Sequence, residues 1–301
     1  MPTTGTSARG FTDVHVHLQD PRFGKTFDEI GEYLQRAKSH GISRFICASA
    51  SPADWNRTAA LARRFSDVLP TFGIHPWNCQ RVSDGWVAPL TLFLDECVAK
   101  DGVFKAAIGE AGLDYAVRDC DDSVRAAQEK TLRLQLELAD ERKLPATLHS
   151  VRSNDALLTI MKDYPNVPVW LLHGWRLTEN DIERAVDMGA FFSFSDRSLS
   201  NEVSRQGVAR VPRDRILLES DGPRLLPPNG YGNKRGEPIR KMAAVQALGE
   251  GGYILAEPAA LLRTATEIAE LRRVAMDEFF RQLAVNEKRF LANWPRVSVD
   301  A

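Results

Sequence analysis

Short apolar segments rich in β-branched residues recur along the chain, and each is followed by a longer segment whose apolar positions repeat with a helical period. This alternation predicts strands that are each followed by a helix. The predicted strands are residues 11–17, 43–48, 68–74, 103–109, 145–149, 167–172, 190–194 and 215–219. The predicted helices between them lie near residues 27–39, 53–65, 86–99, 121–143, 153–163, 178–188 and 199–209.

After the eighth predicted strand the pattern changes. The chain is irregular through "GPRLLPPNGYGNKRGEP", and three helical segments follow near residues 238–248, 257–270 and 274–291. Several helix boundaries carry the expected end residues: Gly41 as a C-terminal stop, and Asp54, Asp122 and Thr178 as N-caps.

Eight strands alternating with helices favour a parallel sheet with crossover helices. Closing eight such units gives a (β/α)8 barrel of about 250 residues. The alternative is an open doubly wound sheet, but that fold usually has a Gly-rich phosphate loop after its first strand, and here "HLQDPRF" follows instead. We therefore predict an α/β fold, a (β/α)8 TIM barrel in one domain (residues 1–301), with residues 1–10 as a flexible extension.

The bulk composition is that of a globular protein with a full core. The chain has 301 residues, of which 44% are hydrophobic and 26% charged, and 39 basic residues nearly balance 40 acidic ones for a net charge of −1. Such a balance argues against a broad electrostatic footprint for duplex DNA or an anionic membrane, so any contact with a polyanion would be a local patch.

The cysteines and the N-terminus bear on the compartment. Four scattered cysteines (Cys47, Cys79, Cys97 and Cys120) form no CxxC pair, which is typical of thiols in a reducing compartment. The segment "MPTTGTSARG" lacks the apolar run of a signal peptide, and no segment is apolar enough to span a bilayer. We expect a cytoplasmic protein that does not associate with membranes.

The first predicted strand, "FTDVHVHL", carries unusual chemistry for a core strand. Because side chains alternate between faces, His15 and His17 lie on one face with Asp13, and Val14 and Val16 lie on the other. One face is therefore apolar, and the other presents two imidazoles beside a carboxylate.

Polar residues also follow the later predicted strands. Glu110 follows the strand in "AAIGEAGLDY", and His149 and His173 end "LPATLHS" and "VPVWLLHGW". Glu219 and Asp221 end "RILLESDGP". Because the strands of this barrel end at one rim, where its active sites are built, these side chains are expected to converge there.

A pair of divalent cations explains this convergence. Unpaired buried carboxylates are costly, and packed imidazoles repel one another once protonated. Imidazole and carboxylate ligands suit Zn and Mn, and a bridging carboxylate with water suits Mg or Mn. The predicted ligands of two metal ions are His15, His17, Glu110, His149, His173 and Asp221. The alternative is a hydrogen-bonded polar network that holds no metal.

The other histidines and two tryptophans have less defined roles. His40, in "KSHGI", is expected at a solvated helix end. His75, in "GIHPW", either lines the pocket as a substrate contact or packs under Pro76. Trp77 and Trp175 lie at loop mouths, where they would stack on a base or pack against the rim.

Seven stretches together resemble the TatD-related family of metal-dependent hydrolases, relatives of the amidohydrolase superfamily. They occur in the family's order: "FTDVHVHL", "GIHPW", "AIGEAGLDY", "LQLELADERKLPATLHS", "LLHGW", "LLESDGP" and "GNKRGEP". A late helix with Asn286 resembles the family's terminal helix. The resemblance implies a barrel, two divalent metal ions on the six residues named above, and a deoxyribonuclease that often degrades single-stranded DNA from 3′ to 5′.

The chain departs from the family pattern in four places. Trp77 stands where a second histidine often follows the proline, Arg152 comes one place later than the usual arginine, and Gly174-Trp175 replaces a small residue and phenylalanine. Residues 243–262 resemble an insertion before the final helices. These departures leave the predicted metal ligands intact and fall on predicted substrate contacts.

The predicted mechanism uses a metal-activated water. Divalent ions lower the pKa of bound water from near 16 toward about 7, Asp221 would act as general base, and Glu110 would bridge the ions. Glu219 would orient a histidine or pair with a basic residue. Cations at the same rim would bind the phosphodiester: Arg22, Arg152, Arg224, Lys234 and Arg235.

Two other functions remain open. An amidohydrolase-like enzyme would use the same ions on a small ester, amide or phosphoester. The related phosphotriesterase-like site has a bridging lysine, whereas Glu110 occupies that place here and Lys105 lies at the other end of the strand. A non-catalytic metal-binding scaffold would be expected to lose a bridging ligand or the base, and this chain keeps all six residues.

Overall fold

The computed structural model describes residues 10–83, 85–99, 106–176, 178–200, 202–223 and 258–294. Eight strands form one parallel sheet in which the spatial order follows the sequence from β1 to β8. Their bounds are Phe11–Val16 (β1), Ile42–Ala48 (β2), Val68–Phe72 (β3), Ala107–Asp114 (β4), Ala146–Val151 (β5), Trp170–His173 (β6), Phe191–Phe194 (β7) and Ile216–Leu218 (β8).

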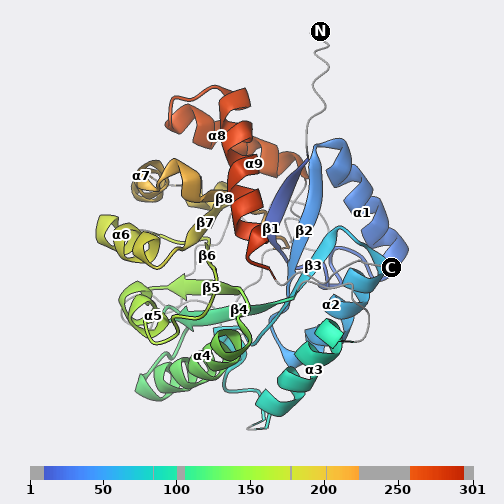
Figure 1. Cartoon of the computed structure of the whole chain (residues 1–301), viewed down its shortest axis with the longest axis vertical. Coiled ribbons are helices and arrows are strands. Elements are labelled where there is room, and N and C mark those ends of the chain that lie inside the picture. Colours follow the sequence, from blue (N-terminus) through green and yellow to red (C-terminus); the bar gives the residue numbers. More distant parts are fainter. Residues whose placement is uncertain are drawn as a thin grey trace.

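Backbone hydrogen bonds bring the last strand back to the first. The amide of Asp221, just after β8, donates to the carbonyl of His15 (3.0 Å), and the amide of His17 donates to Gly222 (2.7 Å). These bonds join the chain after β8 to the end of β1, so the sheet curls into a barrel (Figure 1). The predicted (β/α)8 barrel is confirmed, and the doubly wound alternative is wrong.

Helices cover the outside of this barrel (Figure 1). Among the described residues they are Phe27–Ser39 (α1), Pro52–Arg64 (α2), Val87–Ala99 (α3), Asp122–Arg142 (α4), Asn154–Met161 (α5), Glu179–Asp187 (α6), Glu202–Arg210 (α7), Pro258–Leu271 (α8) and Met276–Ala292 (α9). Short 3-10 turns occur at Pro76–Asn78 (η1), Asp196–Leu199 (η2) and Arg213–Arg215 (η3). No described helix is both long and apolar enough to cross a membrane.

The helix ends match the predicted caps in part. Thr178 caps α6 and exchanges hydrogen bonds with Asp181 in a capping box, and Gly41 has the left-handed φ of +86° expected just past α1. The other two N-cap predictions are wrong. Asp121, not its neighbour Asp122, caps α4, and Asp54 lies inside α2, where its carboxylate accepts the amide of Ala50.

Strand β4 lies later than predicted. It runs over Ala107–Asp114, whereas residues 103–109 were expected, so Glu110 is inside the strand and not beyond its end. The two glycines of "IGEAG" resemble a turn in the sequence, but here they permit close packing. A Cβ on Gly112, whose φ is +144°, would lie 2.0 Å from the carbonyl oxygen of His149 on β5. Only glycine lets these two backbones approach so closely.

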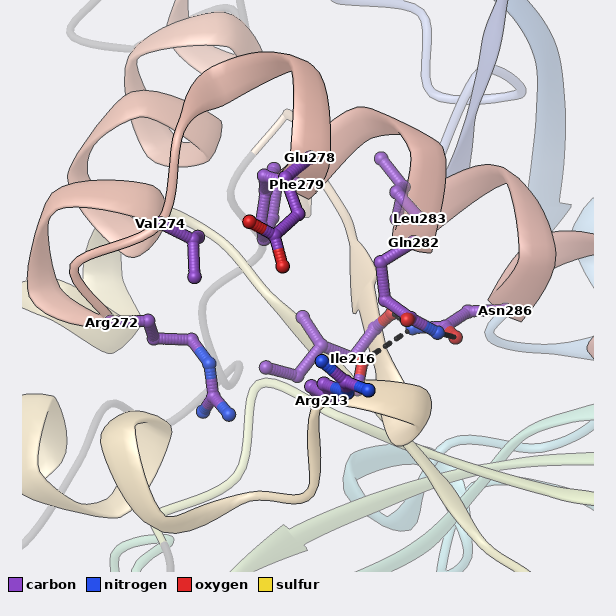
Figure 2. Close-up of a pocket in the computed structure, with 9 residues that line it drawn as sticks. All are labelled: Arg213, Ile216, Arg272, Val274, Glu278, Phe279, Gln282, Leu283 and Asn286. Atoms are coloured by element: carbon purple, nitrogen blue, oxygen red, sulfur yellow. Dashed lines mark hydrogen bonds between the residues drawn. The ribbon is translucent and has the colours of Figure 1, made fainter.

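Helix α9 closes the barrel at the end opposite the carboxyl ends of the strands. The amide of Asn286 donates to the carbonyls of Arg213 and Ile216 at the start of β8 (both 2.8 Å; Figure 2). The carboxylate of Glu287 accepts two bonds from Thr12 on β1. The pocket drawn in Figure 2 lies between α9 and the chain around η3, has a volume of about 40 Å³ and has room for a few water molecules only.

Some predicted features lie outside the described residues. They are the extension at residues 1–9, the helix near 238–248, the greater part of the 243–262 segment, and Lys105, Arg224, Lys234 and Arg235. The last residues of that segment, from Pro258 on, form the start of α8.

Candidate metal centre

Glu110 lies at the middle of a buried cluster of imidazoles. Its Oε2 is 3.3 Å from Nε2 of His15 and 3.5 Å from Nε2 of His17, both at the end of β1. Its Oε1 is 2.8 Å from Nε2 of His173 on β6 and 3.0 Å from Nδ1 of His149 on β5. One carboxylate therefore faces two separate pairs of histidines, one pair at each oxygen.

Asp221 and His75 complete the cluster. Oδ1 of Asp221 is 4.0 Å from Nε2 of His17, and Nε2 of His75 is 3.2 Å from Oε1 of Glu110. The structure thus brings together all six residues predicted as metal ligands. Within the part of the chain that the structure describes, ligand atoms within 4.8 Å of one another form three groups that could hold an ion: His15–His173–Asp221, His15–His17–Glu110 and His75–Glu110–His149.

Burial and neighbouring charges oppose each other at Glu110 and His173, whereas both lower the pKa of His15. Burial alone would raise the pKa of Glu110, but His75, His173 and His15 around it hold that pKa well below its usual value. Burial lowers the pKa of His15, and the neighbouring His173 lowers it further. For His173, burial works toward a lower pKa, yet the adjacent Glu110 and Glu219 raise it well above the usual value.

The donor set fits divalent cations, because several buried groups have poor partners within the protein. Neither ring nitrogen of His15 makes a hydrogen bond, and its ring stacks on that of His173 with centroids 3.8 Å apart. Nδ1 of His149 lies 3.3 Å from Nε2 of His173. Imidazole nitrogens packed against one another around a carboxylate are costly as free polar groups and are ordinary as ligands of Zn or Mn.

The hydrogen-bond partner of the ring nitrogen that points away from the centre determines which nitrogen carries the proton, and so which one can bind a metal. Nδ1 of His17 lies 2.7 Å from the carbonyl of Ala48, which can only accept, so His17 carries its proton there and leaves the Nε2 lone pair facing Glu110. Nε2 of His149 faces the carboxylate of Asp114 at 3.4 Å, which leaves Nδ1 for the centre. Nε2 of His17 and Nδ1 of His149 are thus the nitrogens that face the centre and would bind a metal there.

His75 has the opposite arrangement. Its Nδ1 accepts the backbone N–H of Trp77 at 3.2 Å, so the neutral ring carries its proton on Nε2, the atom that faces Glu110. Burial lowers the pKa of His75 to about 4, which keeps the ring neutral near pH 7. In this state His75 presents a hydrogen-bond donor to the centre. We therefore favour a donor role over the ligand role that its distances alone would allow.

Sequence reasoning missed Asp114, which closes the outer side of His149. It is fully buried at the end of β4, and its Oδ2 also accepts the indole N–H of Trp77 at 2.6 Å. Because β4 was predicted to end at residue 109, the period-two relation between Glu110 and Asp114 went unused. With the strand extended, that spacing would have pointed to a second inward carboxylate.

The predicted peripheral residues occupy varied positions. Glu219 is fully buried, with its Oε2 3.7 Å from Nδ1 of His173. Arg152 is exposed just after β5, with a φ of +57°. The ring of Trp175 is only 2% exposed, so it offers almost no surface to a base. Half-buried Arg22 is paired with Asp20 at 2.7 Å.

A second residue that sequence reasoning missed, the cation Arg197, lies beside Asp221. Arg197 belongs to η2, in the loop that follows β7, and its Nη1 is 3.5 Å from Oδ2 of Asp221. Burial would raise the pKa of Asp221, but His173 and Arg197 hold it below the usual value. The position after β7 is the one clue the sequence offered, because loops that follow the strands line this rim.

The order and spacing of these residues match a known family. The family profile described as "TatD related DNase" matches residues 12–292. The chain belongs to the TatD-related DNase family. Among its relatives, the "Uncharacterized metal-dependent hydrolase YjjV" of Escherichia coli (strain K12) is 29% identical over 92% of this chain and 95% of its own length.

Other TatD-related proteins agree with this assignment. The "3'-5' ssDNA/RNA exonuclease TatD" of Erwinia tasmaniensis is 28% identical over 71% of this chain and 80% of its own length. The crystal structure of YjjV, a TatD homologue from Escherichia coli, superposes with a TM-score of 0.75 at 27% identity, over 94% of this chain and 98% of that one. The predicted family is therefore confirmed, and this TatD-related chain is a metal-dependent hydrolase.

Proposed function

We propose that this protein is a deoxyribonuclease that hydrolyses phosphodiester bonds at the 3′ end of single-stranded DNA with two divalent metal ions. The observation that carries the proposal is the carboxylate of Glu110 between two pairs of imidazoles. In this assignment His15 and His17 would hold one ion, His149 and His173 would hold the other, and Glu110 and Asp221 would supply carboxylate oxygens to them. The relatives named as exonucleases support the choice of substrate.

Bound divalent ions would supply an ionised water at neutral pH and neutralise charge on the phosphoryl oxygens. Asp221 is the proposed general base. Its carboxylate is at the mouth of the centre, with Oδ1 toward His17 and Oδ2 toward Arg197, and its lowered pKa keeps it ionised and able to accept a proton.

The remaining side chains would bind and orient the substrate. His75 would donate its Nε2 proton in a hydrogen bond to a phosphoryl oxygen, because its tautomer leaves that donor facing the centre. Arg152 and Arg197, exposed after β5 and β7, would contact phosphates of the strand. Arg22, Arg224, Lys234 and Arg235 are proposed for the same task, whereas the burial of Trp175 removes it from this group.

The test is cleavage of labelled DNA by metal-stripped protein. Single-stranded DNA with a 3′ label is incubated with protein to which Mg²⁺, Mn²⁺ or Zn²⁺ is returned, beside Asp221→Asn. We expect metal-dependent release of 3′ nucleotides that is lost in the variant while its thermal unfolding is unchanged. Full activity in Asp221→Asn would refute the proposed role of Asp221 as general base.

Two other results would replace the proposal. Protein that binds two ions but cleaves no DNA or RNA would be assigned to hydrolysis of a small ester, amide or phosphoester. Protein that binds metal and hydrolyses no member of either class would be a scaffold.

A further inference from the structure

A buried carboxylate that belongs to none of the metal-binding groups lies directly behind one of the histidines. Asp114 has no exposed surface, and its Oδ2 is 3.4 Å from Nε2 of His149. The opposite nitrogen of that ring, Nδ1, is 3.0 Å from Oε1 of Glu110. The imidazole of His149 therefore lies between two carboxylates, one at the centre and one behind it.

The protein holds Asp114 from several sides. Its Oδ1 accepts the backbone N–H of Ala116 at 2.9 Å. Gln128 on α4 binds the Asp114 backbone twice, accepting from its N–H at 2.8 Å and donating to its carbonyl at 3.0 Å. These contacts fix both the chain and the carboxyl plane, so Oδ2 has little freedom to turn away from His149.

Trp77 supplies a further bond to the same oxygen. Its indole N–H donates to Oδ2 of Asp114 at 2.6 Å from the η1 turn. The indole also contacts the ring of His75 edge-on, with centroids 4.2 Å apart, while the backbone N–H of Trp77 sets the tautomer of His75. Trp77 thus contacts His75 directly and is linked to His149 through Asp114.

We propose that Asp114 is a positioning residue that holds His149 with its proton on Nε2 and its Nδ1 lone pair toward the metal, and that Trp77 holds Asp114 in that position. The inference rests on the proposed metal centre but not on the identity of the substrate. An acceptor behind a metal-binding histidine fixes both the tautomer and the ring orientation, and its loss typically weakens metal binding about 10- to 100-fold.

The substitution Asp114→Asn tests this role with little change in volume. If the new carboxamide keeps its oxygen toward the N–H of Ala116, its NH₂ group takes the place of Oδ2 and faces Nε2 of His149. It then favours the tautomer with the proton on Nδ1, and a protonated Nδ1 cannot bind a metal. We expect the affinity for one of two Zn²⁺ ions, measured by competition with a chromophoric chelator, to fall about 10- to 100-fold. Trp77→Phe should lower it less, in the same direction.

Matched controls separate positioning from general stability. Asp181→Asn removes another buried carboxylate, in the first turn of α6, which accepts hydrogen bonds from the N–H of Thr178 and the side-chain amide of Asn154. Trp55→Phe removes another indole donor, which bonds the carbonyl of Gly73 at 3.1 Å. We expect both controls to lower the melting temperature without changing Zn²⁺ affinity.

Each result decides the inference. It is supported if Asp114→Asn weakens one Zn²⁺ site and if saturating Zn²⁺ restores that site's occupancy. It is overturned if both Zn²⁺ affinities stay within twofold of the parent while the melting temperature falls as in Asp181→Asn, or if the parent binds no Zn²⁺. A parent that binds Zn²⁺ but cleaves no DNA would refute the proposed nuclease alone.

Discussion

Replacing Glu287 with glutamine should change how the stability of the barrel depends on pH. The Glu287 side chain on α9 is buried against β1, where its two oxygens accept the N–H and the hydroxyl of Thr12 at 2.8 and 2.9 Å. Burial raises the pKa of this carboxyl from 4.5 to about 7, although Thr12 and the nearby Arg44 oppose the shift. The folded protein therefore holds the Glu287 proton more tightly than the unfolded chain does.

The sign and size of the effect follow from this difference in pKa. The contribution of Glu287 to the free energy of unfolding is fully present below pH 4.5 and is lost as the pH rises through about 7. A shift of about 2.5 pKa units corresponds to about 3 kcal/mol in total, of which about 2 to 3 kcal/mol falls between pH 5 and 8. Glutamine cannot ionise, yet it still offers a carbonyl to Thr12.

The assay is urea unfolding of the parent and of Glu287→Gln at pH 5, 6, 7 and 8 in the presence of a chelator. Between pH 5 and pH 8 we expect the free energy of unfolding of the parent to decrease by about 2 to 3 kcal/mol more than that of the variant. Asp13, whose burial also raises its pKa to about 7, is common to both proteins and cancels in the difference. Glu183→Gln, at an exposed position of α6, serves as the control.

Parallel pH profiles for the parent and Glu287→Gln would refute the reasoning. They would mean that Glu287 stays ionised in the folded protein at low pH, and that its bonds to Thr12 outweigh the cost of burying the charge.

Three further predictions concern the centre and the strands that carry it. Gly112→Ala should lower the free energy of unfolding by more than about 2 kcal/mol, because its Cβ would overlap the carbonyl of His149. Gly189→Ala, at a position that also has a positive φ but has open space around it, should lower the free energy of unfolding less, and thermal melting measures both. His75→Ala should lower kcat about 10²-fold on the substrate established for the parent while leaving Zn²⁺ affinity unchanged, since we assign His75 as a donor; a loss of affinity would make it a ligand. Removing metal with a chelator should lower the melting temperature, and free Zn²⁺ at 100 times its Kd should return about 2.7 kcal/mol.

The barrel was predictable because its pattern is local. An apolar strand segment or an amphipathic helix segment can be recognised in a window of about ten residues. Most described strands begin or end within three residues of the predicted position. Strand β4 is the exception, because Gly109 and Gly112 make it resemble a turn in the sequence. Their purpose is visible only when β5 lies beside them, with the backbone of His149 in the space that a Cβ would fill.

The sequence was enough to predict which residues form the candidate centre, but not which ring nitrogen of each histidine carries the proton. Strand ends and face alternation bring the polar residues to one rim, and those are sequence properties. Which nitrogen of a histidine carries the proton depends on a partner from another part of the chain: the carbonyl of Ala48 for His17, Asp114 for His149, and the N–H of Trp77 for His75. No spacing rule within one segment contains that information.

Two tryptophans near the centre depart from the family pattern. The family resemblance predicts all six metal ligands, and it also predicts other residues at the positions of Trp77 and Trp175, beside His75 and His173 in the sequence. The Trp77 indole N–H is bonded to Asp114, and Trp175 is buried. Neither side chain presents a free polar group to a substrate in the described structure. Trp77 therefore changes what packs behind the histidines more than what faces the substrate, so replacing it with the family's residue should alter metal affinity before it alters substrate choice.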